Sequence, residues 1–318
     1  MEKAKTVNNE LDVVGIVMAA YNSERFIGEQ LDSILSGTYQ NIHIYVRDDG
    51  SKDATVSVVK EYVKRYPKQI ELIENKDNGG YVKNFLTGVM EAKEDYIMFC
   101  DHDDVWLPDK VKITLEAMKK AERKSEAKEI PIVVFTDNAI VDGDLKPLGA
   151  SFYERSNYNF EQMGLSYMLM ENKLIGCTIM INKALKDKIT VLPEHARVHD
   201  WWVALIASAF GKIVFVNKQT MLYRQHGTNE IGNRNFVKYV ADAVTTLKKQ
   251  REKLILTEQQ AGDFLKIFGS VLSEEQKKLV EQFANLSKYP FWKRKILVIK
   301  NKYLKSGLVR NIGVLLLI

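Results

Sequence analysis

The sequence contains little cysteine and no long apolar run, and each shortage excludes a class of protein. Cys100 and Cys177 are the only cysteines in 318 residues, so the chain has no disulfide framework and fits a reducing compartment. No stretch of about 18 consecutive apolar residues is present, so we expect no membrane-spanning helix. Residues 1–12 are polar and lack the apolar core of a signal peptide. These shortages predict a cytoplasmic protein without a transmembrane anchor.

Acidic side chains are absent from residues 285–318, where large apolar side chains alternate with cations. We interpret this segment as an amphipathic surface that lies on anionic lipid at the inner face of the cell membrane. A helical subdomain or a homo-oligomer contact with a solvated basic face stays an alternative. Nucleic-acid binding is a poor fit, because no reading motif accompanies the charge. The eight basic residues are Lys288, Lys293, Arg294, Lys295, Lys300, Lys302, Lys305 and Arg310.

A glycine-rich phosphate loop is also missing after the first expected strand, where Ala19-Ala20-Tyr21-Asn22-Ser23 stands instead. Its absence argues against a nucleotidyl- or phosphotransferase that would use similar carboxylates. What is present is a regular alternation of strand and helix patterns, which predicts parallel βαβ units. Strands are expected at 13–18, 42–46, 70–73, 96–99 and 132–135, with helices at 25–35, 53–66, 81–92 and from Pro108.

The second half of the chain has a less regular pattern. Strands are expected at 178–181, 213–216 and 221–224, a helix at 199–210, and basic helices from residue 235. We therefore expect an α/β domain over residues 1–230 and a helical C-terminal region over residues 231–318.

Three carboxylates, Asp101, Asp103 and Asp104, follow the apolar strand 96–99 within four residues. Clustered anions repel one another and are costly to bury, so a bare core would not hold them. Mg²⁺ or Mn²⁺ would relieve the conflict by taking carboxylate and phosphate oxygens as ligands. The pattern predicts a metal–phosphate site at the carboxyl end of a strand. A polar loop with a helix cap is the alternative.

Two other expected strands also end in polar residues. Small alanines before Tyr21 allow a flat ligand to approach, and Tyr21 could stack on it, although a plain turn capped by Ser23 explains the segment equally well. Asp48 and Asp49 exceed what the following turn requires, so a carboxylate here could bind a base or ribose. Lys83 lies in the first turn of a helix, where an anion or only solvent would meet it.

The last two motifs lie farther along the chain. Asp200 precedes two tryptophans at the start of an apolar helix, where it could be a cap or a general base beside a sugar platform. Arg224 and His226 lie close together and could meet phosphate oxygens or a metal, although a lone histidine is usually structural.

Taken together, the ordered motifs resemble the family 2 glycosyltransferases of the GT-A fold, and within them the bacterial rhamnosyltransferases of surface polysaccharide synthesis. The resemblance covers about residues 12–230. The residues that carry it are Ala19-Ala20-Tyr21-Asn22, Arg47-Asp48-Asp49-Gly50-Ser51, Asn78-Gly79-Gly80, Asp101-His102-Asp103-Asp104-Val105-Trp106, His199-Asp200-Trp201 and Tyr223-Arg224-Gln225-His226.

The resemblance implies a fold and a set of roles. The fold is α/β, with a mixed, mostly parallel sheet flanked by helices and a basic helical C-terminal extension. Asp200 matches the catalytic base. The metal contacts are Asp103, the later end of the DxD motif, and His226. The donor-nucleotide contacts are Ala19, Tyr21, Asn22, Asp49, Lys83 and Asp101. The sugar or acceptor contacts are Asp104, Trp106, His199, Trp201, Trp202 and Arg224. His102 departs from the glutamine of these rhamnosyltransferases, which weakens the donor assignment.

The resemblance also implies an inverting, metal-dependent transfer of a sugar to a saccharide or lipid-linked acceptor. Residues 12–135 would bind the nucleotide-sugar donor and residues 136–230 the acceptor. The first choice of donor is dTDP-rhamnose, and a UDP-hexose is the alternative. A non-catalytic carbohydrate- or membrane-binding protein is the alternative from another class, and retention of every matched acid argues against it.

Overall fold

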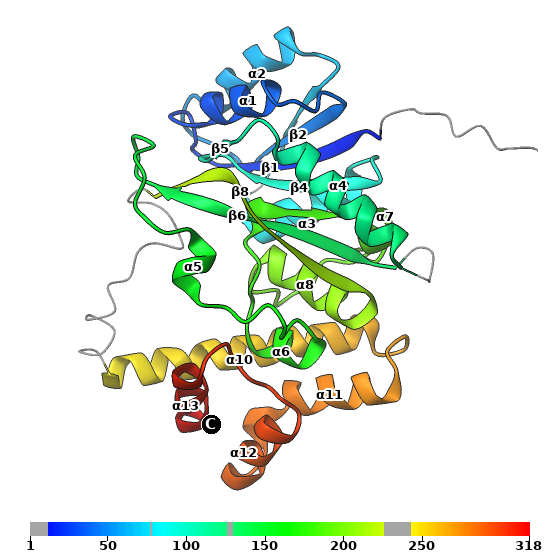
Figure 1. The fold of residues 1–318 in the computed structure, drawn as a ribbon, viewed down its shortest axis with the longest axis vertical. Coiled ribbons are helices and arrows are strands. Elements are labelled where there is room, and N and C mark those ends of the chain that lie inside the picture. Colours follow the sequence, from blue (N-terminus) through cyan, green and yellow to red (C-terminus); the bar gives the residue numbers. More distant parts are fainter. Residues whose placement is uncertain (1–11, 77, 126–129, 226–242) are drawn as a thin grey trace, which may run out of the picture.

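The computed structural model describes residues 12–76, 78–125, 130–225 and 243–318. An eight-stranded sheet crosses the molecule in the order β3-β2-β1-β4-β7-β6-β8-β5 (Figure 1). The expected mixed, mostly parallel sheet is therefore confirmed.

The first four strands form the parallel half of the sheet, as the sequence pattern predicts. Every residue of β1 is buried, because apolar side chains on both of its faces meet covering helices. The strands are β1 (Val14–Ala20), β2 (Ile42–Asp48), β3 (Ile70–Glu74) and β4 (Tyr96–Asp101), and the helices between them are α1 (Ile27–Leu35), α2 (Thr55–Arg65) and α3 (Tyr81–Glu91).

The other half of the sheet is mixed. Strand β7 (Ile179–Ile181) lies antiparallel between β4 and β6 (Ile132–Val141). The two strands expected at 213–216 and 221–224 are one strand, β8 (Lys212–Arg224), so that division was wrong. Residues 217–219 look like a turn because they are exposed, and the pairing of β8 with β6 shifts register there. The two-residue strand β5 (Val105–Trp106) closes the edge beside β8.

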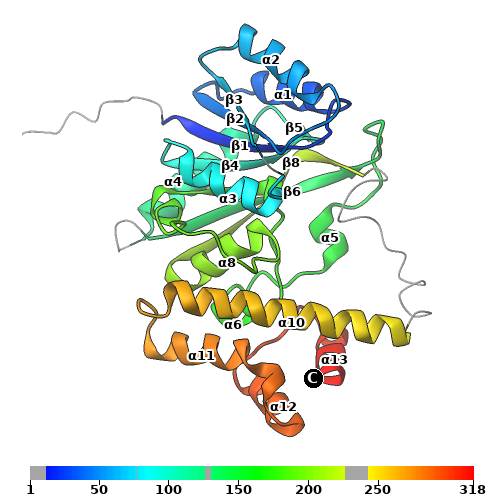
Figure 2. The same ribbon diagram turned by 180° about the vertical axis from the view of Figure 1, so that it is seen from behind.

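Helices cover both faces of the sheet. Helices α3 and α8 (His199–Phe210) contact each other on one face, and α4 (Lys110–Arg123) packs on the opposite face (Figures 1 and 2). Helix α8 begins at the residue that the sequence predicts. Shorter elements complete this part: α5 (Phe152–Ser156), α6 (Leu165–Met170), η1 (Gly176–Thr178) and α7 (Lys183–Lys186).

The C-terminal region is helical from residue 243 and lies beyond α6 and α8 (Figures 1 and 2). Its long helix packs against the α/β part through Phe264 and Phe268, which contact Trp202. Within the described residues, none of the helices is both long and apolar enough to cross a membrane. The elements are α10 (Ala243–Phe268), α11 (Glu274–Ala284), η2 (Leu286–Lys288), α12 (Phe291–Lys300) and α13 (Leu308–Leu317).

Candidate active site

The parallel strands bring three polar loops to one edge of the sheet. In the register of the sheet, Ala19 of β1 lies opposite Asp101 of β4, and Ala20 lies opposite Asp48 of β2. The loops after these strands therefore begin side by side, where open α/β sheets bind ligands. The Nδ1 atom of His102 lies 3.1 Å from the carbonyl oxygen of Ala19 and ties the β4 loop to β1.

The carboxylates after β4 are held close together in a buried place. Asp104 is fully buried, and its Oδ1 atom accepts a hydrogen bond of 3.1 Å from the amide of Arg224. Burial, and then the charge of Asp103, raise the pKa of Asp101 to about 7 and that of Asp104 well above its usual range. The fold therefore keeps anions where they repel one another, which is typical of functional sites.

A divalent cation such as Mg²⁺ or Mn²⁺ fits this cluster. Ligand atoms of Asp101, Asp104 and Cys177 all lie within 4.8 Å of one another. The Oδ2 atom of Asp104 is buried and has no hydrogen-bond partner among the described residues. Burial raises the pKa of the Cys177 thiol, which favours its protonated form, so a hard cation would take the carboxylate oxygens as ligands. The geometry joins Asp104 to Asp101, and a ligand role for Asp103 stays a prediction.

Arg224 holds the carboxylate loop in place. Its Nε atom donates to the carbonyl oxygen of Asp103 at 2.7 Å and another guanidinium nitrogen donates to the carbonyl oxygen of Gly143 at 2.7 Å. The guanidinium also pairs with Glu29, and only 2% of Arg224 is exposed. The expectation that Arg224 contacts a sugar is wrong in this structure, because these contacts direct the guanidinium at the protein. His226 lies outside the described residues.

Asp49 organises the loop before α3. Its Oδ1 atom accepts hydrogen bonds from the amide of Gly79 at 3.0 Å and the side chain of Asn75 at 3.1 Å, and its Oδ2 atom accepts from the amide of Gly80 at 2.9 Å. Gly80 has a φ of 78°, which glycine adopts without strain. The described role of Asp49 is to fix this turn, and a contact with a base or ribose stays a prediction.

The neighbouring expected donor contacts are all exposed but differ in the bonds they make. Tyr21 is 45% exposed, and Lys83 is exposed on the first turn of α3, so both side chains are open to a ligand. Asn22 instead joins two loops: its amide donates to Ser51 Oγ at 2.9 Å, and its side-chain oxygen accepts from the amide of Lys52 at 2.8 Å. Asn22 therefore aligns the β1 and β2 loops.

Asp200 lies in the first turn of α8, only 6% exposed. Its Oδ1 atom accepts a hydrogen bond of 3.0 Å from the side chain of Asn172. Burial raises the pKa of Asp200 to about 7, although hydrogen bonds from Trp201, Gly176 and Asn172 favour the charged form. The carboxylate lies near enough to Asp101 for its charge to raise the pKa of that group too. A carboxylate poised near neutrality suits a general base.

Two residues beside Asp200 belong to the core, and their expected contacts with sugar are wrong. His199 stacks on both Phe85 and Phe99, with ring centroids 4.0 and 5.4 Å away. Burial lowers its pKa to about 3, so the ring is neutral. Trp202 is 1% exposed and packs against α10. Gly176 is required here, because a Cβ atom on it would lie 2.2 Å from His199 Nε2.

The other two tryptophans are also largely buried. Trp106 is 3% exposed, and its ring packs 4.9 Å from Lys110 Nζ, so the structure corrects its expected role as a sugar contact. Trp201 donates from Nε1 to the carbonyl oxygen of Met168 and stacks with Arg197, whose guanidinium lies 4.9 Å from a Trp201 ring centroid. The remaining exposed edge of Trp201 lines a cavity, so a contact with acceptor stays a prediction.

Two residues of the site carry no sequence signal that would have found them. Asn172 meets Asp200 across 28 positions of sequence. Lys110 is buried, donates to Thr220 Oγ1 at 3.3 Å, and has its pKa lowered by burial to about 8. In sequence, Lys110 looks like any lysine near the start of a basic amphipathic helix. Only the packing of α4 against β8 shows that it lies in the core.

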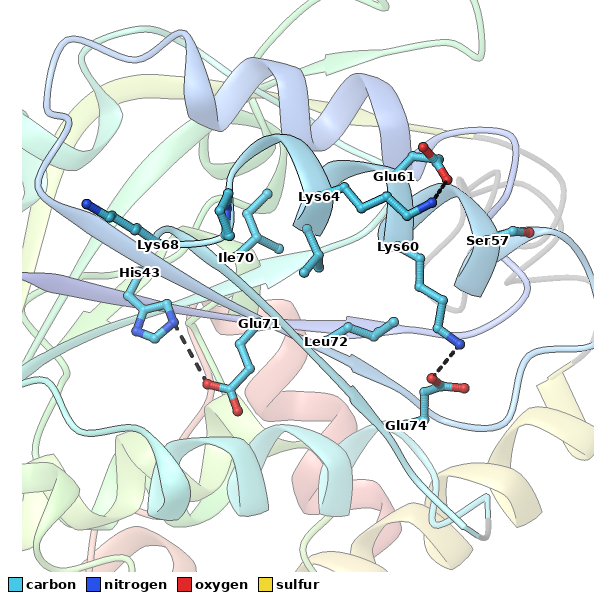
Figure 3. A pocket seen from close by; sticks show the side chains of 12 residues that line it. His43, Ser57, Lys60, Glu61, Lys64, Lys68, Ile70, Glu71, Leu72 and Glu74 are labelled. Carbon is cyan, nitrogen blue, oxygen red and sulfur yellow. Dashed lines mark hydrogen bonds and ion pairs between the residues drawn. The ribbon is translucent and has the colours of Figure 1, made fainter.

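Two cavities differ in their distance from the sequence motifs. One of about 790 Å³ lies at β3 and α2 (Figure 3), away from the motifs. Two of its lysines are paired, with Lys60 Nζ 2.8 Å from Glu74 and Lys64 Nζ 2.6 Å from Glu61, and we assign it no role. A second cavity, of about 290 Å³, is lined by Asn172 and therefore adjoins Asp200.

Comparison with known proteins agrees with this geometry. A sequence profile described as glycosyl transferase family 2 matches residues 15–186. The chain is 30% identical to the dTDP-rhamnosyl transferase RfbG of Shigella flexneri over 226 residues, which cover 68% of this chain and 73% of the relative. It is 28% identical to an uncharacterised glycosyltransferase of Rickettsia prowazekii, over 59% of this chain and 56% of that protein.

Solved structures share the fold. The crystal structure of S. aureus TarS residues 1–349 with UDP-GlcNAc has a TM-score of 0.54 at 15% identity, covering 89% of this chain and 83% of that one. A mannosyltransferase from Pyrobaculum calidifontis, solved with GDP-Man and Mn²⁺, has a TM-score of 0.54 at 14% identity, covering 97% and 79%. The family match, the RfbG relative and this shared GT-A architecture support one conclusion: the chain belongs to glycosyl transferase family 2 and is a glycosyltransferase.

Proposed function

We propose that the protein is an inverting, metal-dependent transferase that moves a sugar from a nucleotide donor to a hydroxyl of a saccharide or lipid-linked acceptor. The observation that carries this proposal is the arrangement of Asp200 beside Asp101. One carboxylate belongs to a cluster suited to a cation, and the other is a separate carboxylate with a pKa of about 7. A single displacement needs one base on the protein, unlike a retaining hydrolase with its pair of carboxylates.

Each described residue has a definite task in this reaction. Asp101 and Asp104 would hold Mg²⁺ or Mn²⁺, which supplies positive charge that stabilises the leaving diphosphate. Arg224 keeps their loop against β8. Asp200 accepts the proton of the acceptor hydroxyl at its carboxylate as that oxygen attacks the anomeric carbon. Asn172 orients the carboxylate for this transfer through its hydrogen bond to Oδ1.

The first choice of donor is dTDP-rhamnose, because the relative RfbG is named as a dTDP-rhamnosyl transferase at 30% identity. UDP-glucose and UDP-galactose are the alternatives. A panel of these three nucleotide sugars, scored by hydrolysis and transfer with Mg²⁺ or Mn²⁺, ranks them. Full activity in excess chelator would contradict the proposed metal dependence.

We also propose that α12 and α13 rest on an anionic membrane surface. Trp292, Ile296 and Ile299 are 61–73% exposed and follow the spacing of one helix face. On α13, Leu308 and Val309 are 76% and 78% exposed. We call these five residues and the cations around them the apolar-basic face. Apolar side chains with cations beside them suit anionic lipid.

Replacing Asp200 by asparagine tests the proposed base. Asp200→Asn should lower transfer about 10²–10⁴-fold, the usual contribution of a general base. Donor affinity, measured by calorimetry, should stay nearly unchanged because asparagine keeps the Oδ1 acceptor. Asp187→Asn, at the exposed carboxylate just after α7, is the matched control and should behave as wild type. Near-normal transfer by Asp200→Asn would refute the assignment.

A further inference from the structure

The 290 Å³ cavity lies where the α/β part meets the C-terminal helices. Asn172 and Trp201 line it from the catalytic side, Leu254 lines it from α10, and Val314 and Leu317 line it from α13. The Asn172 side chain also donates to Asp200. The cavity therefore begins one side chain away from the proposed base.

The polar lining of this cavity is strongly cationic. Arg197, Lys253 and Lys305 line it, and Glu171 is the single acid among its described lining residues. The Glu171 carboxylate is already engaged, because it accepts from the amide of Ser306 at 2.7 Å and from Arg310 at 3.2 Å. Arg197 and Lys305 therefore line the cavity beside an acid that already has other partners.

Two of these cations are held in a partly buried position. Arg197 is fixed by a 2.9 Å hydrogen bond from one guanidinium nitrogen to Thr257 Oγ1 and by stacking on Trp201. Within the described residues, the Lys305 ammonium makes no hydrogen bond or ion pair, while its backbone amide and carbonyl are bound to the Asn311 side chain. Burial lowers the pKa of both groups. For Lys305, the charge of Glu171 opposes this shift, and the charges of Arg310 and Arg197 add to it. An anion in the cavity would relieve this cost.

We propose that this cavity binds a phosphate or pyrophosphate group of the acceptor while the acceptor hydroxyl reaches Asp200. The identity of the ligand as an acceptor rests on the proposed glycosyl transfer. The anion site itself rests on the positions of Arg197 and Lys305 in the cavity. The lining also includes apolar side chains, those of Met170, Leu254 and Val314, which would accommodate an apolar substituent on the phosphate. Phosphate therefore suits the cations, and a chain attached to it suits these apolar side chains.

A binding measurement tests the anion site without catalysis. Calorimetry with inorganic pyrophosphate, in excess EDTA so that no cation bridges it to Asp101, should show saturable binding to the wild-type protein. Lys305→Gln should weaken binding about tenfold to a hundredfold, because a charge-assisted hydrogen bond is lost. Lys305→Arg keeps the charge and should bind within a few-fold of wild type.

Lys278→Gln, at an exposed lysine of α11, is the matched control and should not change binding. Arg197→Gln provides a second variant if Lys305→Gln does not fold, as judged by circular dichroism, and should weaken pyrophosphate in the same way. Equal affinity of wild type and both glutamine variants, or no saturable binding, overturns the proposal.

Transfer assays separate this proposal from the reaction itself. Lys305→Gln should raise KM for a phosphate-bearing acceptor about tenfold or more, while KM for an uncharged acceptor and donor hydrolysis stay unchanged. A water-soluble sugar phosphate and a lipid-linked sugar pyrophosphate distinguish the source of the anion, because only the second can use the apolar side chains of the lining. Absence of donor turnover in wild type would defeat the proposed function and leave the pyrophosphate result standing. If wild type turns over donor normally and the variants keep the wild-type KM for the phosphate-bearing acceptor, only the proposed anion site is refuted.

Discussion

The strand-end site and the C-terminal helices are built by opposite means. At the site, polar groups are buried and fixed: Asp104 is fully buried and Arg224 is 2% exposed. In α12 and α13 the reverse holds, because Trp292 is 73% exposed and Leu308 is 76% exposed. A folded protein usually avoids both placements, since each costs stability or solubility. Each region is thus unfavourable on its own and would be stabilised by its proposed ligand, a cation at the buried carboxylates and lipid at the exposed apolar side chains.

The first prediction concerns the buried carboxylates and removes the charge of Asp101. Asp101→Asn should reduce transfer about 10²–10³-fold, because the loss of a ligand weakens several kcal/mol of charge stabilisation. The same change should make the folded protein more stable at about pH 8 in chelator. The pKa of Asp101 in the folded protein, about 7, lies above its usual value of 3.8. Ionising this carboxyl therefore destabilises the folded state as the pH rises from 3.8 to 7, and the full loss of stability is present above pH 7.

Urea unfolding at about pH 8 and about pH 3.5 checks the stability part, with no gain expected at the lower pH, where both states are protonated. Asp144→Asn, at an exposed loop carboxylate, is the control. A loss of stability at pH 8 in Asp101→Asn would show that the cluster is structural and would remove the basis for a cation there.

The second prediction compares two tryptophans on the C-terminal side of the molecule. Trp202→Ala should lower the free energy of unfolding by about 3–5 kcal/mol, because its ring fills the contact with Phe264 and Phe268. Trp292→Ala should change it by less than about 0.5 kcal/mol, as is usual for an exposed site. Urea unfolding measures both. Similar losses at the two positions would mean that the apolar-basic face is packed rather than exposed.

The sequence predicts most of the parallel half of the sheet, because β1 and β4 are continuous apolar runs, and β2 and β3 are short segments with recurring apolar residues between helical patterns. It does not predict the place of β7, since three residues at Ile179–Ile181 carry no periodicity that orders them between β4 and β6. The division of β8 fails for a related reason. Exposed residues 217–219 interrupt the apolar pattern while the backbone continues past a bulge.

The motifs locate the site well but assign individual roles less well. Asp200 lies close enough to Asp101 for its charge to act on that group, and their proposed roles stay predictions. The roles of Trp202 and Arg224 depend on partners far along the chain, namely α10 and the loop after β4. Whether an aromatic ring is a platform or core, and whether a cation faces ligand or protein, depends on tertiary contacts. A local pattern contains no information on them.

The third prediction concerns the pH dependence of transfer. Because Asp200 must be ionised to accept a proton and its pKa is about 7, kcat/KM should fall about tenfold per pH unit below 7. Saturating Mg²⁺ keeps the metal cluster ionised during the measurement. Asn172→Ala removes a hydrogen bond to the charged form, so its midpoint should move to higher pH. A wild-type midpoint near 4 would contradict the buried carboxylate as the base.

The last prediction concerns the exposed apolar-basic face and its contact with lipid. If α12 lies on anionic lipid, each lysine near the surface contributes about 1 kcal/mol, so Lys293→Gln should weaken binding to phosphatidylserine vesicles about fivefold. Lys277→Gln on α11 should have no effect, and both variants should unfold like wild type because both lysines are exposed. Sedimentation with vesicles, with and without added salt, measures the partition. If salt and Lys293→Gln leave the partition unchanged, charge does not drive contact with lipid. An oligomer contact would then be the better account of the exposed side chains, because association would cover Trp292 and Ile296 without anionic lipid.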